Sequence, residues 1–77
     1  MIRVLLFAYI KERLGTEEVV LHEQQMTVRQ LRERLQHEYD LQTAPSLMVA
    51  INEDFATDDD IIYAGDVVAL IPPVSGG

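Results

Sequence analysis

Apolar residues alternate with other residues along the first part of the chain. The even positions of residues 2–8 are all apolar, which predicts a β-strand with one apolar face, and Leu5 and Phe7 lie on the opposite face. A short helical turn is predicted over residues 9–14, and the glycine after it occupies the position of a C-terminal cap. A second strand is predicted over residues 18–22. The two strands are expected to be antiparallel, because the connection is too short for a parallel crossover.

The clearest local signal is the start of a helix at Thr27. Thr27 and Gln30 have the spacing of a capping box, in which each side chain bonds the other residue's backbone N–H. The apolar residues that follow recur at helical spacing and form one stripe of Val28, Leu31, Leu35 and Tyr39. The basic residues lie off this stripe, and we expect a solvated face containing Arg29, Arg32 and Arg34. The helix should end near residue 39, before a loop over residues 43–46.

The second half of the chain predicts a further set of short strands. Residues 47–51 are all apolar, as in a strand that is covered on both sides. A turn over residues 52–54 leads to a short return strand at 55–56, and residues 61–63 should pack back onto the core. The last strand is predicted over residues 67–71. It should stop there, because the two prolines that follow cannot continue a hydrogen-bonded ladder.

This order of elements predicts an α+β fold, in which one main helix packs on one face of a mixed sheet. The first and last strands are expected to be adjacent and parallel in the centre, with the intervening chain forming the crossover. Such an arrangement is the ubiquitin-like β-grasp. We predict one β-grasp domain over residues 1–71 and an extended tail over residues 72–77.

Composition narrows the possible functions. The formal charge is −7 over 77 residues, which disfavours nucleic acid as a partner and favours basic protein surfaces. The sequence has no cysteine, so disulfides, iron–sulfur clusters and a thiol nucleophile are excluded within it. No apolar run has the roughly 20 residues of a membrane span, and the apolar start is too short for a signal peptide. We therefore expect a cytoplasmic protein with no membrane partner.

Several polar residues invite a catalytic or metal-binding interpretation that the sequence does not support. The acidic run 58–60 lacks the ligand spacing of a calcium loop, and we expect it to be a solvated loop. His22 and His37 are far apart and are expected at the surface. Neither Ser46 nor Ser75 has an evident base. No metal site and no permanently bound cofactor are predicted, and an enzyme acting alone is disfavoured.

The tail is the feature with the clearest chemical meaning. Pro72 and Pro73 favour an extended conformation, and the five residues 73–77 reach at most about 17 Å when fully extended. Gly76 and Gly77 have no Cβ, so this segment fits a channel too narrow for side chains. A terminal carboxylate is also a group that proteins bind with backbone N–H groups. The tail is therefore expected to insert into the active site of a partner.

The chain resembles the small subunits of molybdopterin synthase and, more broadly, the ubiquitin-related sulfur carriers. The resemblance covers nearly the whole length and is strongest in the tail. It rests on Phe7-Ala8 with Lys11-Glu12 and Gly15, on Thr27-Val28 with Leu31, on residues 49–52, on residues 64–69, and on Pro72-Pro73-Val74-Ser75-Gly76-Gly77. Two positions depart from the family pattern. Lys11 replaces the usual arginine, and Val67 replaces a common acidic residue.

This resemblance implies a role for the Gly77 carboxylate. An adenylyltransferase similar to ubiquitin-activating enzymes would use ATP to join Gly77 to AMP, and a sulfur donor protein would convert the adenylate into a thiocarboxylate. The large subunit of the synthase would bind the tail, and sulfur would pass to cyclic pyranopterin monophosphate during molybdenum cofactor biosynthesis. The family also implies a heterotetramer in which this chain is a non-catalytic sulfur donor.

Docking onto such partners requires a surface beside the tail. Leu5, Phe7 and Ile71 are predicted to form an exposed apolar patch, as the family's partner interface does. The alternative is that the chain's own loops near residues 61–62 cover these side chains. The predicted partner-binding set is completed by the tail residues Pro72, Pro73, Val74 and Ser75.

Three other functions are compatible with the same fold. A thiazole-pathway sulfur carrier shares the Gly-Gly end, although the Pro-Pro-Val-Ser tail and Phe7-Ala8 favour the molybdopterin role. A ubiquitin-like protein modifier would attach Gly77 to lysines of target proteins, and this chain has one lysine of its own, Lys11. A passive β-grasp interaction module would function without residues 76–77.

Overall fold

The computed structural model describes residues 1–73. The chain forms short strands and helices that are joined by turns. Their bounds are β1 Ile2–Leu6, α1 Ala8–Leu14, β2 Glu18–Leu21, β3 Gln25–Thr27, α2 Val28–Glu38, the 3₁₀ turn η1 Ala44–Ser46, β4 Met48–Ile51, β5 Asp54–Phe55, β6 Ile61–Tyr63 and β7 Val67–Ile71.

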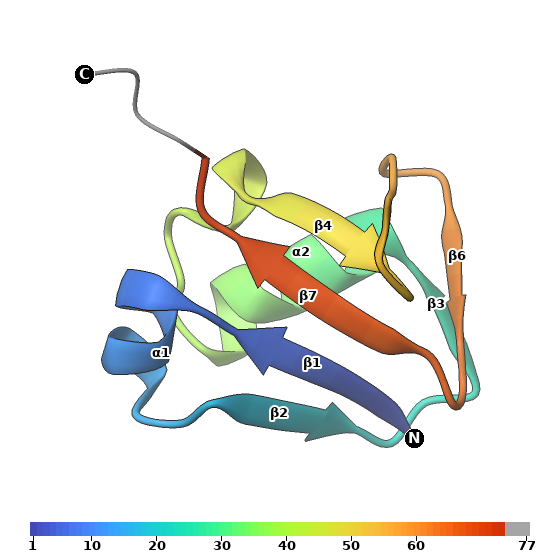
Figure 1. The fold of residues 1–77 in the computed structure, drawn as a ribbon, viewed down its shortest axis with the longest axis horizontal. Helices are drawn as coiled ribbons and strands as arrows, with labels where there is room; N and C mark the ends of the chain where they lie inside the picture. Colours follow the sequence, from blue (N-terminus) through green and yellow to red (C-terminus); the bar gives the residue numbers. More distant parts are fainter. Residues whose placement is uncertain (74–77) are drawn as a thin grey trace.

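A five-stranded mixed sheet organises the fold, with strand order β2-β1-β7-β4-β5. The first and last strands, β1 and β7, lie side by side at its centre and run parallel (Figure 1). β1 pairs antiparallel with β2, and β4 pairs antiparallel with both β7 and β5. These pairings confirm the predicted ubiquitin-like β-grasp.

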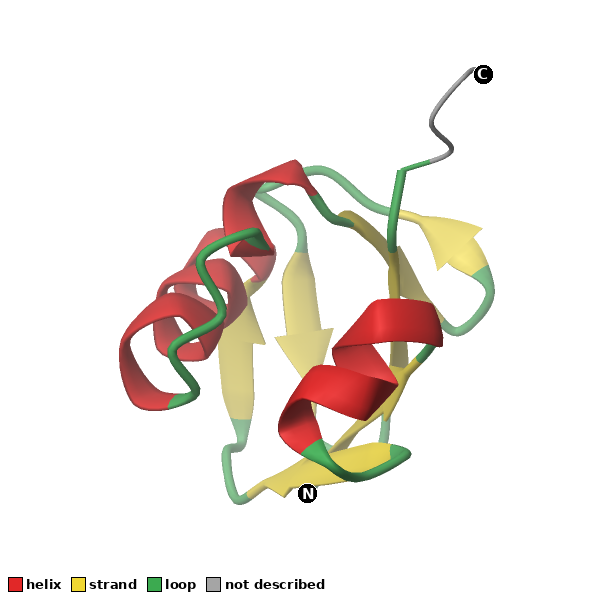
Figure 2. Ribbon diagram, turned by 90° about the vertical axis from the view of Figure 1, so that its left-hand side faces the viewer, coloured by secondary structure: helices red, strands yellow, loops and turns green. Residues whose placement is uncertain are grey.

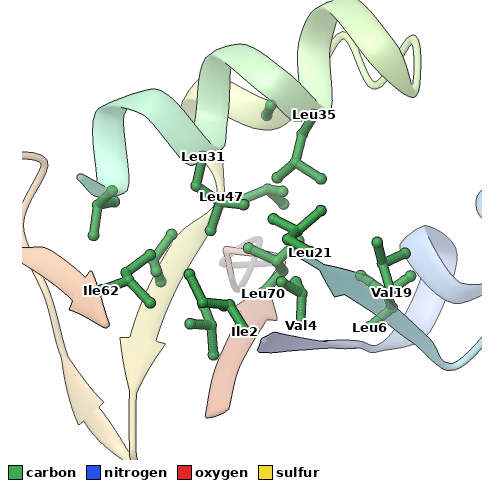
Figure 3. Packing of buried hydrophobic residues seen from close by; sticks show 14 of the residues in the cluster. Ile2, Val4, Leu6, Val19, Leu21, Leu31, Leu35, Leu47, Ile62 and Leu70 are labelled. Atoms are coloured by element: carbon green, nitrogen blue, oxygen red, sulfur yellow. The ribbon is translucent and has the colours of Figure 1, made fainter. Parts of the chain in front are cut away.

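The helix α2 covers one face of this sheet (Figure 2). Its start forms the predicted capping box: the backbone N–H of Gln30 donates to Thr27 Oγ1 at 3.1 Å, and the backbone N–H of Thr27 donates to Gln30 Oε1 at 2.8 Å. Leu31 and Leu35 reach from the helix toward the strands (Figure 3) and are almost fully buried. Since the inward residues of β1 and β7 are buried with them, one apolar core joins helix and sheet.

The chain leaves the first strand earlier than the sequence predicts. β1 ends at Leu6, and Ala8, predicted on its inward face, instead begins α1 and is exposed. Ala8 has a φ of 53°, a left-handed conformation that an alanine adopts only with strain. The backbone therefore turns sharply after Phe7, and Phe7 lies at the end of the sheet. Gly15 caps α1 as predicted, with its N–H bonded to the Lys11 carbonyl.

The sequence prediction missed a second sheet of two strands. β3 pairs antiparallel with β6, so that Met26 lies opposite Ile62 and both are buried. Residues 61–63 thus pack onto the core as predicted through Ile62, while Ile61 and Tyr63 remain exposed. Three-residue strands carry too little alternation to be recognised in the sequence.

The prediction of a solvated basic face is wrong for Arg32 and Arg34. Arg32 Nη1 donates to the carbonyl oxygens of Ala44 and Leu47, at 2.8 and 2.6 Å, and its Nε donates to Asp58 at 2.8 Å. Arg34 pairs with Glu23 and Glu38. Arg29 is exposed as predicted.

The acidic run 58–60 also has a structural role that its composition did not predict. The first N–H groups of α2, from Val28 and Arg29, donate to the backbone carbonyls of Asp60 and Asp58. These bonds satisfy donors that a helix start leaves without partners. The loop is therefore fixed to the helix instead of being merely solvated.

Candidate partner-binding face and tail

One face of the five-stranded sheet has no helix over it, and Figure 1 is viewed from this side. The strand register places outward residues in rows across the sheet. One row runs from Glu18 through Leu5, Ala69 and Ala50 to Phe55. At the end of the sheet where β7 stops, Ile71 pairs with Met48, and Phe7 follows the Leu6–Leu70 pair. We call these residues the outer face: Leu5, Phe7, Met48, Phe55, Val67, Ala69 and Ile71.

The outer face is largely apolar and accessible. Phe7 is 45% exposed and Met48 is 40% exposed, while Leu5 and Ile71 are partly buried between them. Residues 61–62 belong to β6 and pair with β3, so they do not cover this patch. Exposed apolar surface of this kind is a candidate for partner binding. The structure thus brings Leu5, Phe7 and Ile71 to one face, as the sequence predicted.

Sequence reasoning missed Phe55, the most exposed large apolar residue of the described chain at 68%. Its position follows from the β4–β5 hairpin, where Phe55 lies opposite Ala50 and shares its outward orientation. The signal was the single large apolar side chain in an otherwise polar segment after the buried strand. Without the hairpin register, the sequence did not show to which face this side chain points.

The root of the tail lies at the same end of the sheet as Phe7. β7 ends at Ile71, Pro72 is partly buried and Pro73 is exposed. Because proline has no N–H, the ladder stops there, as predicted. The predicted tail residues Val74, Ser75, Gly76 and Gly77 lie outside the described residues.

A shallow recess opens in the outer face at the β4–β5 turn. Its floor is apolar, formed by Leu5, Val67 and Ala69, and its rim is formed by Asn52 and Glu53. Asn52 Nδ2 donates to Asp66 Oδ1 at 3.0 Å, and the N–H of Val67 donates to Asn52 Oδ1 at 3.0 Å. These bonds join the two turns that border the recess and hold its shape.

The basic side chains around the outer face are paired with acidic ones. Near Phe7, Lys11 Nζ pairs with Glu17 at 2.9 Å, and this contact lowers the pKa of the Glu17 carboxyl. Across the described residues every basic side chain forms such an ion pair, namely Arg3, Lys11, Arg13, Arg29, Arg32 and Arg34. The net negative charge therefore resides in the remaining acids.

His22 and His37 are exposed, as predicted. Within residues 1–73, no group of three or more histidine or acidic side chains is placed to hold a metal ion. No helix in this part of the chain is long and apolar enough to cross a membrane.

Comparison with protein families decides where the chain belongs. Residues 4–77 match the model of the ThiS family. The chain belongs to the ThiS family. It is 33% identical over 81 aligned residues to the molybdopterin synthase sulfur carrier subunit of Escherichia coli (strain K12), and the match covers 100% of both chains. It is 37% identical to the molybdopterin synthase sulfur carrier subunit of Arabidopsis thaliana, over 99% of this chain and 82% of that one.

Solved structures confirm the fold. The crystal structure of SAMP1 from Haloferax volcanii superposes with a TM-score of 0.77 and 28% identity, over 99% of this chain and 98% of that chain. A complex of subunits 1 and 2 of molybdopterin-converting factor from Helicobacter pylori 26695 matches with a TM-score of 0.67 and 24% identity, over 99% of this chain and 97% of that one. The second likeness supports the fold alone. Together these matches confirm the β-grasp fold of this chain.

Proposed function

We propose that this chain is the sulfur-carrier subunit of a molybdopterin synthase and that it acts through the carboxyl group of Gly77. The observation that carries the proposal is the match over 100% of both chains to a molybdopterin synthase sulfur carrier subunit. The placement of Phe7 and Ile71 at the root of a tail that ends in Gly-Gly supports it. The expected compartment is the cytoplasm.

The proposed chemistry begins with activation, because a free carboxylate is a poor electrophile. A Gly77 carboxylate oxygen attacks the α-phosphorus of ATP, and pyrophosphate leaves. The persulfide of a sulfur donor protein then attacks the acyl carbon and AMP leaves. A thiol reductant cleaves the sulfur–sulfur bond and releases a thiocarboxylate on Gly77. Its anionic sulfur is a nucleophile that needs no neighbouring base, by analogy with a thiolate.

The sulfur acceptor in this proposal is cyclic pyranopterin monophosphate, held by the large subunit. Each transfer delivers one sulfur atom, and hydrolysis restores the Gly77 carboxylate. Two chains that carry a thiocarboxylate are therefore used for one dithiolene. The reacting residues besides Gly77 belong to the large subunit, and Gly76 lets the tail enter a narrow channel. This chain binds no permanent cofactor in the proposal, and ATP is bound by the adenylyltransferase.

The proposed role of the outer face is docking. Phe7, Leu5 and Ile71, with Met48 and Phe55, present an apolar surface at the root of the tail. A partner that packs on this surface fixes the position from which residues 72–77 extend, and the length of the tail sets the distance to the reacting atom. Pro72, Pro73, Val74 and Ser75 are proposed to line the partner's channel.

A second candidate function is protein modification. It is favoured by the similarity to a structure named small archaeal modifier protein 1, from Haloferax volcanii, at 25% identity and a TM-score of 0.78. In that case the Gly77 adenylate would acylate lysines of target proteins. A thiazole-pathway carrier would use the same thiocarboxylate for a different acceptor.

The experiment that separates these functions is a reconstituted sulfur transfer. The chain carrying a thiocarboxylate is mixed with its cognate large subunit and cyclic pyranopterin monophosphate, and molybdopterin is measured by its fluorescent oxidation product. The proposal predicts that two molecules of the thiocarboxylate form of the chain are consumed for each molybdopterin formed. The chain without Gly77 serves as the control. If the thiocarboxylate form yields no molybdopterin, the molybdopterin role is contradicted.

A further inference from the structure

The recess in the outer face has one polar group that the fold itself does not use. Asn52 is bonded to Asp66 and Val67, and both carboxylate oxygens of Asp66 accept bonds, from Asn52 and from the N–H of Tyr63. Glu53 lines the same recess, yet its carboxylate forms no hydrogen bond or ion pair with the described residues. The recess therefore combines an apolar floor with one carboxylate available to a partner.

The surrounding charges strengthen this negative rim. Asp54 follows Glu53 and makes no ion pair with residues 1–73. Arg3, which pairs with Val67 across β1 and β7, lies on the same face, but its side chain is bonded to Glu18. At the opposite end of the outer face, the charge of Lys11 is compensated by Glu17. The face is thus negative near Glu53 and electrically balanced near Phe7.

The backbone conformation of Glu53 is one that favours glycine. Asn52 and Glu53 form the two-residue connection between β4 and β5, with φ of 49° and 74°. Such a turn favours Asn-Gly, because the second residue adopts a left-handed conformation. Glu53 has the side chain that this conformation disfavours. Its local contacts give no structural reason for a carboxylate there.

We propose that Glu53 is a docking residue that binds a lysine or arginine of the partner while an apolar partner side chain fills the recess over Leu5, Val67 and Ala69. The inference rests on the proposed function, in which the occupant is the large subunit. The negative charge at the rim, which suits a basic partner side chain, and the continuity of the recess with the proposed docking face favour this occupant. An ion pair at the rim of an interface acts mainly on the rate of association and on its salt dependence.

The test is the association kinetics of the full chain with its cognate large subunit at low and high salt. Glu53→Gln removes the charge and keeps a side chain on the left-handed backbone. Glu53→Gly removes the charge and also relieves the backbone strain. Both are expected to slow association about two- to fivefold at low salt, and Glu53→Lys about tenfold. These differences should vanish in about 0.5 M salt, where exposed charges are screened.

Glu33→Gln is the matched control, because Glu33 is an exposed acid of α2 without an ion pair among the described residues, on the helix side of the sheet. It should associate at the rate of the unchanged chain. Equal rates for Glu53→Gln, Glu33→Gln and the unchanged chain would overturn the inference. So would a loss seen only in Glu53→Gly, since backbone conformation would then be the cause. If the unchanged chain does not bind the large subunit at all, the proposed function itself fails.

Discussion

Replacing Arg32 by alanine tests how the structure fixes the connection between α2 and β4. The Arg32 side chain is 17% exposed, and its guanidinium donates to the Asp58 carboxylate and to three backbone carbonyls, those of Ala44, Leu47 and, at 3.4 Å, Pro45. Alanine removes all four bonds and leaves these carbonyls without the arginine as a partner. The connection from helix to strand, and the 57–60 loop at the helix start, would both lose an anchor.

The expected loss of stability follows from these bonds. A hydrogen bond to a charged group contributes about 1.5–3 kcal/mol, and water will replace part of the loss at a site this close to the surface. We therefore expect Arg32→Ala to lower the free energy of unfolding by about 2–4 kcal/mol. For a domain of this size the total free energy of unfolding is about 4–12 kcal/mol. The melting temperature should fall by at least about 8 °C, at about 4–8 °C per kcal/mol.

Urea unfolding followed by far-UV circular dichroism measures this difference, and Arg29→Ala is the matched control. Arg29 lies one turn earlier on α2 and pairs with Asp59, but the two side chains are 57% and 85% exposed. Its loss should change stability by no more than about 0.5 kcal/mol. Arg32→Lys should recover only part of the loss, since an ammonium lacks the planar fork. Equal midpoints for Arg32→Ala and Arg29→Ala would refute the reasoning.

Three further predictions concern the turn, the docking face and the tail. Glu53→Gly should raise the free energy of unfolding by about 0.5–1 kcal/mol, because φ at this residue is 74°; a lower urea midpoint would contradict the assigned turn. Phe7→Ala should weaken binding to the large subunit at least tenfold, about 1.4 kcal/mol. Tyr63→Ala, which truncates an exposed side chain of the other sheet, should leave this affinity unchanged in calorimetry; equal losses would argue against the outer face. Deleting Gly76 and Gly77 should abolish thiocarboxylate formation yet preserve the melting temperature, because the buried core spans residues 2–70; a large drop would assign the tail a structural role.

Most of the fold could be predicted because its local signals agree with one another. The capping box at Thr27, the apolar stripe of α2 and the alternation in β1 all point to one helix on one face of a sheet. The sequence could not reveal interactions that depend on the tertiary arrangement. Nothing near Arg32 in the sequence indicates the carbonyls of Ala44 and Leu47 as its partners.

The candidate site was predictable to a similar extent. Outward alternation placed Leu5 and Phe7 on one face, and the strand register then brought Ile71 beside them. Phe55 and Glu53 were missed because the hairpin that orients them is defined by backbone conformation. Two residues with positive φ at Asn52 and Glu53 have no strong signature when the second is not glycine.

The most direct test of the central claim is the intact mass of the chain after incubation with ATP, a sulfur donor protein and its cognate adenylyltransferase. The proposal predicts replacement of one oxygen atom by sulfur, located by fragmentation on Gly77. The chain without Gly77 should keep its mass in the same reaction. An unchanged mass for the full chain, in a mixture that converts a known sulfur carrier, would contradict the claim that Gly77 carries sulfur.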